Sequence, residues 1–291
     1  MDAQKLANER RIFTCRGGSH AYGLNTPTSD EDFRGVFIGL LANVFGFFPI
    51  EHAQFGGDYM VYEFRKFVNL AKECNPNIIE LLFVDERDIL FSTPQWEKLR
   101  AHRDWFLTRK ARHTFAGYAH AQLKKIRGHK TWLGNPQSVE PPSPAKYVRR
   151  KWIDDLGNVE VFDQNAYDAA KRTWESYWSW KNNRNETRAK MEEESGYDRK
   201  HAMHLVRLLR MAHEILRGDG VLVKRADRDE LLSIRDGAWS YEEVVAHAQD
   251  LEAKLEELYE NSPLPHSPDV HKINDLMLEI YGDFWRERGE F

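Results

Sequence analysis

Short runs of apolar and alternating residues dominate the first third of the chain. Three such runs predict strands, at residues 11–17, 32–41 and 58–64. Residues 64–74 instead carry apolar side chains at intervals of three and four, which predicts an amphipathic helix that ends before Pro76. Strands followed by a helix in this way indicate a small mixed α/β domain.

The hydrophobic pattern becomes mainly helical from about residue 96 onward. Long segments with the helical period cover residues 109–126, 196–217 and 241–259. Residues 137–162 interrupt this pattern with three prolines and with KWIDDLGNVEVF, which predicts a hairpin that turns near residues 155–158. We therefore expect a set of helices with an exposed excursion between them.

The composition is that of a globular protein. Its 291 residues suggest one large or two modest domains, and 41% hydrophobic with 30% charged residues argues against disorder. No apolar run approaches the ~20 residues of a membrane helix, and the charged first residues provide no signal region. Cys15 and Cys74 are too few for a disulfide framework. Together these features predict a cytoplasmic protein with reduced thiols and no membrane segment.

The overall charge of the chain excludes few classes of binding partner. The chain has 42 Lys and Arg residues against 46 Asp and Glu, a formal charge of −4, so it lacks the overall basic excess of many nucleic-acid-binding proteins. Between residues 103 and 150, however, basic residues outnumber acidic ones. That segment could face an anionic substrate or form an ordinary solvated surface, and the sequence leaves both interpretations open.

The most informative stretch is GGSHAYGLNTPTSDEDFRGVF, at residues 17–37. Gly18-Ser19 closes the first predicted strand, and Asp30 and Asp32 open the second, where alternation puts both carboxylates on one face. Carboxylate oxygens suit Mg²⁺, and a glycine lets the backbone approach a phosphate. These groups favour phosphoryl or nucleotidyl transfer. The alternative is a plain turn followed by a loop carboxylate.

These motifs carry a resemblance to a known family. Gly18-Ser19, ten residues and then Asp30-x-Asp32 resembles the signature of the polymerase-beta nucleotidyltransferase superfamily. Longer strings resemble its RNA-repair-pathway polymerase-beta branch of bacterial and phage proteins; they are GSHAYGLNTPTSDEDFRGV, VYEFRKFVNL, NPNIIELLF and GYDRKHAMHLVRLLRMAHEIL. The resemblance covers most of residues 11–90 and 196–235 and is weak over about 130–190.

The resemblance implies an α+β architecture. We expect a small mixed-sheet nucleotidyltransferase domain at residues 1–108 and a mainly helical domain at residues 109–291. The helical domain would bind substrate and nucleotide and would contain the excursion at about residues 130–190. The active site is then expected in the cleft between the two domains.

The resemblance also implies a third carboxylate on a neighbouring strand, and two Mg²⁺ ions that activate the nucleophile and hold the triphosphate. Asp58 and Glu63 are the candidates, and their opposite parity puts them on opposite faces of a strand. Glu63 matches the acidic position before FRK and is favoured, with Asp58 as the alternative. Either residue could instead be structural, Glu63 as a helix-start carboxylate. If Glu63 is the third acid, it could also help to deprotonate the attacking hydroxyl.

Four residues of the same stretch are assigned to the nucleotide. Gly18 and Ser19 are expected to hold the β and γ phosphates. His20 follows them and could touch a phosphate or be a surface histidine. Arg34 shares the strand parity of the aspartates, so it could bind phosphate or pair with Asp30 and Asp32.

The predicted helix at residues 196–217 supplies the remaining candidates. A polar stripe beside its apolar face includes Lys200 and His204, with Arg207 at the edge, and this mixture suits triphosphate and base recognition. A solvated basic face is the alternative. His201 and His204 lack a third ligand nearby in the sequence, so zinc is not expected there.

We therefore expect Mg²⁺-dependent transfer of a nucleoside monophosphate from an NTP to an acceptor hydroxyl, with release of pyrophosphate. The resemblance implies an RNA end as acceptor, such as a tRNA that is repaired or extended. A small molecule or a protein side chain is the alternative within the same chemistry. A catalytically silent nucleotide- or RNA-binding protein is the alternative of another class.

Overall fold

The structure is a computed structural model that describes residues 2–154, 157–184 and 186–290. The chain forms two compact units, one made of residues 1–122 with 202–291 and the other of residues 123–201. We call them the sheet unit and the insert unit. The functional boundary expected at residue 108 remains a prediction, because compactness alone does not assign function to a segment.

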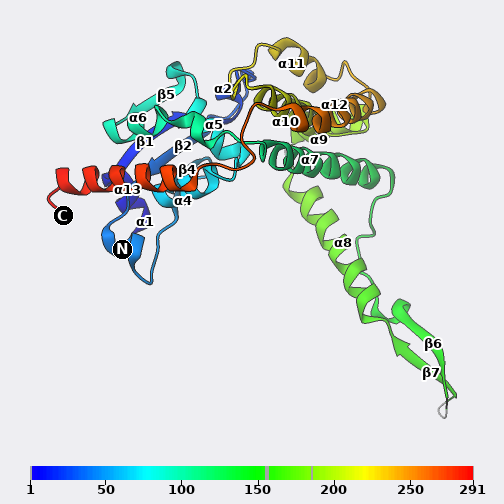
Figure 1. The fold of residues 1–291 in the computed structure, drawn as a ribbon. Helices are drawn as coiled ribbons and strands as arrows, with labels where there is room; N and C mark the ends of the chain where they lie inside the picture. The colour runs from blue at the N-terminus through cyan, green and yellow to red at the C-terminus, as the bar shows by residue number, and fades with distance from the viewer. Residues whose placement is uncertain (1, 155–156, 185, 291) are drawn as a thin grey trace. The chain divides into compact units, whose positions relative to one another are not determined.

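A five-stranded mixed sheet forms the centre of the sheet unit (Figure 1). Its order is β3-β4-β2-β1-β5, in which β2 and β4 pair in parallel and the other neighbours are antiparallel. The strands are β1 Arg11–Arg16, β2 Phe33–Phe37, β3 His52–Phe55, β4 Tyr59–Glu63 and β5 Ile89–Ser92. The three predicted strands are confirmed as β1, β2 and β4. The other two have only four residues each, too few to show a period.

The helices of the first hundred residues cover this sheet. They are α1 Ala3–Glu9, α2 Gly18–Tyr22, α3 Leu41–Phe45, α4 Phe64–Ala71, α5 Pro76–Phe83 and α6 Pro94–Arg100. Phe13 of β1 stacks on Trp96 with ring centroids 3.8 Å apart, and Phe67 meets the same ring edge-on. The helix predicted at residues 64–74 ends at Ala71, and a second helix begins at Pro76, because Asn75 caps it by accepting from Asn77 N.

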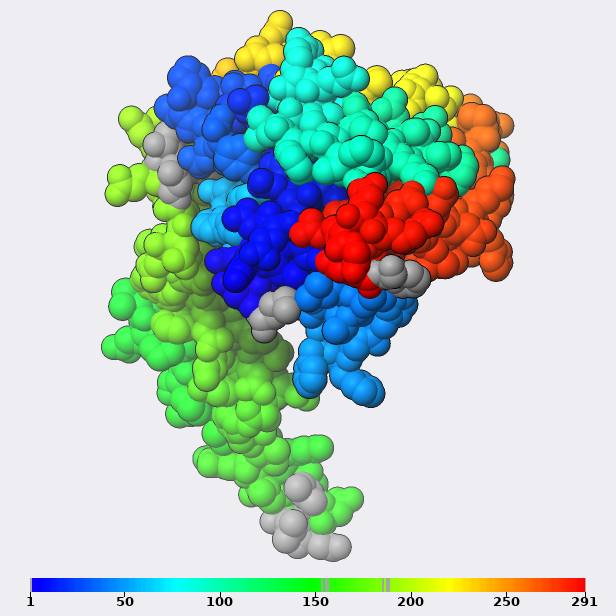
Figure 2. Space-filling view, turned by 90° about the vertical axis from the view of Figure 1, so that its left-hand side faces the viewer, coloured from blue at the N-terminus to red at the C-terminus, as the bar shows by residue number. Residues whose placement is uncertain are grey.

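The C-terminal helices complete the sheet unit. They are α10 Arg199–Arg217, α11 Arg228–Asp236, α12 Tyr241–Asn261 and α13 Val270–Glu287, of which α10 begins in the insert unit. Figure 2 shows α13 against the surface formed by the N-terminal segment and α6, where Lys98 Nζ lies 2.8 Å from Asp283 Oδ2. Buried Arg10 donates to Glu290 just beyond the helix, at 2.7 Å. The last residues of the chain therefore pack on the first ones.

The insert unit consists of helices and one hairpin. Its elements are the second half of α7 Ala111–Gly134, β6 Val148–Ile153, β7 Gly157–Phe162, α8 Gln164–Asn183 and α9 Glu186–Ser195. The predicted hairpin is confirmed, with β6 and β7 antiparallel from the Val148–Phe162 pair inward (Figure 1). Part of its predicted turn, residues 155–156, lies outside the described residues.

The architecture as a whole is α+β, as the sequence predicted: a mixed sheet with its helices, followed by a mainly helical remainder. None of the helices in the described ranges is long and apolar enough to cross a membrane.

Candidate active site

The turn after β1 and the aspartate before β2 are in direct contact. Gly17 N donates to Asp32 O at 2.8 Å, which joins the two segments through their backbones. Gly18 has φ +56°, and a Cβ added there would lie 2.0 Å from Asp32 Oδ2. No side chain fits in that space, and the left-handed backbone favours glycine independently. The sequence Gly-Ser is thus explained by how closely the carboxylate of Asp32 approaches the turn.

The two aspartates of the motif lie in the loop that leads into β2. The strand begins at Phe33, one residue after Asp32. The prediction that the two aspartates are the first residues of the strand is therefore wrong, although Asp32 directly precedes it. Asp30 is exposed, and Asp32 keeps 31% of its side chain exposed. Arg34 Nη2 lies 3.6 Å from Asp32 Oδ1, and Arg34 Nη1 donates to Asp58 O at 2.9 Å. Arg34 therefore links the aspartate to the start of β4.

The two candidates for the third acid lie at opposite ends of β4. In the parallel register Phe33 is opposite Tyr59 and Phe37 is opposite Glu63, and Phe33 N donates to Asp58 O at 2.9 Å. Asp58 therefore lies beside Asp32 in the register, whereas Glu63 lies beside the far end of β2. Opposite residues in a register share a face, so Glu63 faces the side of the sheet away from Arg34.

Glu63 has a structural environment of its own. Its side chain is buried, accepts from Arg65 N at 2.8 Å as the N-cap of α4, and accepts from Tyr281 Oη of α13 at 2.6 Å. Burial raises the pKa of Glu63 above its usual value, although these hydrogen bonds oppose the shift. The structure thus brings Glu63 to α13 and does not bring it to Asp32.

A cavity of about 180 Å³ opens beside the glycine turn. Its lining comes from the turn, from β2, β4 and α5, and from the loop after α10; the residues are Gly17, Gly18, Ala21, Tyr22, Arg34, Tyr62, Asn77, Glu80, Leu81, Val84 and Val223. Arg34 is opposite Met60 in the register, so these two side chains lie on the same face of the sheet. Tyr62 is two residues after Met60 on β4 and therefore shares that face with Arg34. The cavity therefore borders the Asp32 side of the sheet.

Comparison with known proteins adds a family to this geometry. Residues 2–139 match the model of the RNA repair pathway DNA polymerase beta family. Over these residues, slightly less than half of the chain, the protein is similar to that family. No curated protein and no solved structure matches the chain. The matched segment contains β1, the glycine turn and both aspartates of the motif, so the resemblance inferred from the sequence is confirmed over residues 11–90, whereas its part at residues 196–235 stays a prediction.

Similarity of residues 2–139 to the RNA repair pathway DNA polymerase beta family supports a nucleotidyltransferase-type activity and the use of a divalent metal. The family also implies nucleotide or RNA-type substrates. The family match covers a range of residues and assigns no role to any one of them. The side chains that would bind the metal or the nucleotide therefore follow from the geometry of this chain.

The buried side of the cavity is a charged cluster that the sequence did not reveal. Tyr22 Oη donates to Glu80 Oε2 at 2.5 Å, and Arg207 Nη1 donates to Glu80 Oε1 at 2.8 Å. The Arg207 guanidinium also lies over the Tyr22 ring, 3.7 Å from its centroid. Burial raises the pKa of Tyr22 above its usual value, so the phenol stays protonated as a donor. Arg207 is 4% exposed, so direct phosphate contact, which we expected from the sequence, does not fit its position.

The remaining nucleotide candidates are distributed between the two units. Ser19 and His20 lie half-buried on α2, in the same turn as Gly18. His204 is half-buried on α10 in the sheet unit, whereas Lys200 is exposed and belongs to the insert unit. The structure therefore has Ser19 and His20 in the same turn as Gly18, and the roles of His204 and Lys200 in nucleotide binding stay predictions.

Lys224 is a basic residue at the turn that sequence reasoning missed. Its Nζ donates to His20 O at 3.1 Å and to Asp88 Oδ2 at 3.1 Å. Its stem lies against Gly23, where an added Cβ would lie 3.3 Å from Lys224 Cε. The surrounding string VLVKRADRDE has no period or motif that indicates such a position, so only the tertiary structure reveals it.

Proposed function

We propose that this protein transfers a nucleoside monophosphate from an NTP to a hydroxyl at an RNA end, with tRNA among the acceptors, as a Mg²⁺-dependent cytoplasmic enzyme of RNA repair or modification. The observation that carries the proposal is the contact between Gly18 and the carboxylate of Asp32. It supports a phosphate-binding turn and a metal-binding acid within one site. The family of residues 2–139 supports the same reaction class.

The donor set fits Mg²⁺. Asp32 is partly exposed and Asp30 is exposed, so both carboxylates can bind a cation that keeps waters and phosphate oxygens in its shell. Asp58 is exposed beside Asp32 in the register, and we assign it the third position in preference to Glu63. When bound, Mg²⁺ would neutralise the charge of the triphosphate and of the attacking oxygen.

The residues of the turn would position the nucleotide. Gly18 and Ser19 would hold phosphate oxygens through the backbone N–H groups of the turn, and the Ser19 hydroxyl can also donate to them. Arg34 lines the cavity and can exchange its Asp32 contact for a phosphate oxygen. Arg207 and Tyr22 act through Glu80 as positioning residues for α5 and α2. His20, His204 and Lys200 remain candidates for the nucleotide.

The reaction balances without a further reagent. The acceptor oxygen forms a bond to the α-phosphorus, and the bond from this phosphorus to the α–β bridging oxygen breaks. Pyrophosphate leaves with that electron pair, and the proton of the hydroxyl passes to solvent water, which reaches the exposed carboxylate of Asp30. The side chains of the protein would contribute by positioning the two reactants and by neutralising their charge.

A survey with labelled nucleotides tests the proposal. The full chain is incubated with Mg²⁺ and each α-labelled NTP, together with total tRNA, with a mixture of small hydroxyl compounds, or with no acceptor. We expect label in RNA and release of pyrophosphate. Label only in a small molecule, or only in protein, would replace the RNA acceptor and keep the chemistry. Absence of transfer to all three, with NTP still bound, would support a silent nucleotide-binding protein.

A further inference from the structure

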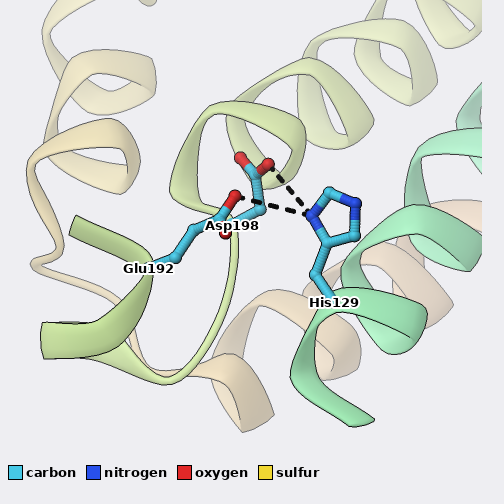
Figure 3. Close-up of side chains that lie close together, drawn as sticks. All are labelled: His129, Glu192 and Asp198. Carbon is cyan, nitrogen blue, oxygen red and sulfur yellow. Dashed lines mark ion pairs between the residues drawn. The ribbon is translucent and has the colours of Figure 1, made fainter. Parts of the chain in front are cut away.

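A second group of metal-binding side chains is buried in the insert unit. His129 of α7, Glu192 of α9 and Asp198, which precedes α10, point toward one another (Figure 3). One ligand atom from each lies within 4.8 Å of the other two. Glu192 and Asp198 are 1% and 0% exposed. We call this group the His129 cluster. None of its three residues is among those assigned to the metal, the phosphates or the nucleotide of the proposed transfer.

The distances in the cluster suit metal coordination better than hydrogen bonding. His129 Nδ1 lies 3.5 Å from Glu192 Oε1 and 3.5 Å from Asp198 Oδ2, beyond the 2.7–2.9 Å typical of a charge-assisted hydrogen bond. The same Nδ1 is buried and makes no hydrogen bond to any described residue. Atoms at tetrahedral corners about 2.0–2.2 Å from a zinc ion lie about 3.3–3.6 Å from one another. The two separations from His129 Nδ1 are of that size.

The charge of the cluster also suits a divalent cation. Two buried carboxylates are costly unless nearby positive groups compensate them. Arg184 Nη1 lies 3.5 Å from Glu192 Oε2, and His201 Nε2 lies 3.5 Å from Asp198 Oδ2. A bound dication would place further positive charge beside both carboxylates while His129 stays neutral, the form in which imidazole binds metals.

Neighbouring groups hold the three ligands in place. Asp198 Oδ1 accepts from His201 N at 3.0 Å, which fixes the carboxylate at the start of α10. The imidazole of His129 stacks on Trp132, with centroids 5.8 Å apart and 21° between the planes. Such contacts orient ligands and are typical of metal sites.

We propose that His129, Glu192 and Asp198 bind one zinc-like transition-metal ion that joins α7, α9 and α10. One imidazole with two carboxylates favours such an ion over Mg²⁺, which prefers oxygen ligands alone. Three protein ligands leave a fourth position for water. His201 is a positioning residue for Asp198. The proposal does not depend on the nucleotidyl transfer, because it concerns a separate group of side chains.

Zinc binding by the full chain tests this site. The protein is stripped with a chelator, dialysed into millimolar Mg²⁺ to occupy the aspartates near Gly18, and titrated with Zn²⁺ by calorimetry. We expect the wild type to bind one zinc per chain more than His129→Ala. His120→Ala is the control, because His120 is exposed and pairs with Glu252 elsewhere. Equal zinc stoichiometry in the wild type and His129→Ala would refute the site.

A second variant covers the case in which His129→Ala loses its fold. Glu192→Gln preserves shape and removes one ligand charge. Co²⁺ replaces Zn²⁺ as the probe, because its visible absorption is strong only in tetrahedral sites. We expect the wild type to show this absorption and Glu192→Gln to lose it. Absorption that is missing in the wild type, or unchanged in Glu192→Gln, would show that the cluster is an ion-pair network instead.

Discussion

Asp32 beside the glycine turn and Asp198 of the His129 cluster are both carboxylates that we propose as metal ligands, yet their surroundings differ. Asp32 keeps 31% of its side chain exposed, whereas Asp198 is fully buried. Asp32 contacts Gly18, which lies 14 residues earlier in the sequence. Asp198 lies beside His129, which is 69 residues earlier. An open carboxylate can exchange ligands during a reaction, and a buried one is suited to hold a permanent partner.

The two units also differ in charge. The insert unit has 16 Lys and Arg against 12 Asp and Glu, a formal charge of +4, which leaves 26 against 34, or −8, for the sheet unit. The near-neutral total therefore conceals a basic segment. Under the proposed function, this difference makes the insert unit the better candidate for a contact with an RNA backbone.

Removal of the acids at the turn should have the largest effect. We expect Asp30→Ala with Asp32→Ala to reduce nucleotide transfer by about a thousandfold or more, because several kcal/mol of charge stabilisation is lost. Both residues are partly or fully exposed, so circular dichroism and thermal melting should stay close to wild type. Glu31→Ala, in the same loop, is the matched control. Mg²⁺-dependent activity that persists in the double variant would contradict the assignment.

Gly18→Ala should have the next largest effect. The new methyl group would lie 2.0 Å from Asp32 Oδ2 and the left-handed backbone costs about 1–2 kcal/mol in addition. We expect kcat/KM for the NTP to fall by about a hundredfold and the melting temperature by several degrees. Gly57→Ala is the control, since nothing lies within 4 Å of its added Cβ. Unchanged kinetics in Gly18→Ala would show that the turn does not bind phosphate.

Glu63→Gln and Asp58→Asn separate the two candidates for the third acid. We expect Asp58→Asn to lower kcat by at least about tenfold, and Glu63→Gln to leave kcat within about threefold, because Glu63 contacts Tyr281 and lies away from Asp32. The reverse pattern in kcat would make Glu63 the catalytic residue. Activity assays and urea denaturation of both variants decide between them.

The pH dependence of Glu63 provides an independent check. Its pKa is higher in the folded chain than in the unfolded chain, so folding favours the protonated form. The stability that this group contributes is present below the unfolded value of about 4.3 and is lost as pH rises through the raised folded value. Urea denaturation across this range should show that loss in the wild type and lack it in Glu63→Gln.

The smallest effect concerns the basic insert unit. We expect RNA affinity to fall as salt concentration rises, because phosphate contacts release counterions. Arg149→Ala with Lys151→Ala, on one face of the β6–β7 hairpin, should reduce the slope of log K against log salt by about 1–2 and leave NTP binding unchanged. Filter binding at several salt concentrations measures the slope. An affinity that does not depend on salt would contradict an RNA contact through basic residues.

The elements that could be predicted from the sequence are those formed by residues close together in the chain. The strands at β1, β2 and β4, the hairpin and the turn beside Asp32 depend on short-range alternation and glycine. The partner of Arg207 and the position of Lys224 depend on contacts between residues 127 and 136 positions apart, which no local pattern encodes. His129 was missed for the same reason, since its carboxylate partners come from two other segments.

The packing of α13 on the sheet unit has a consequence for synthesis. Tyr281 donates to Glu63 and Arg10 donates to Glu290, so these two early residues meet their partners only after residues 281–290 have been synthesised. The turn and its aspartates emerge long before that moment. Until then, a nascent chain exposes the surface that α13 covers on α6.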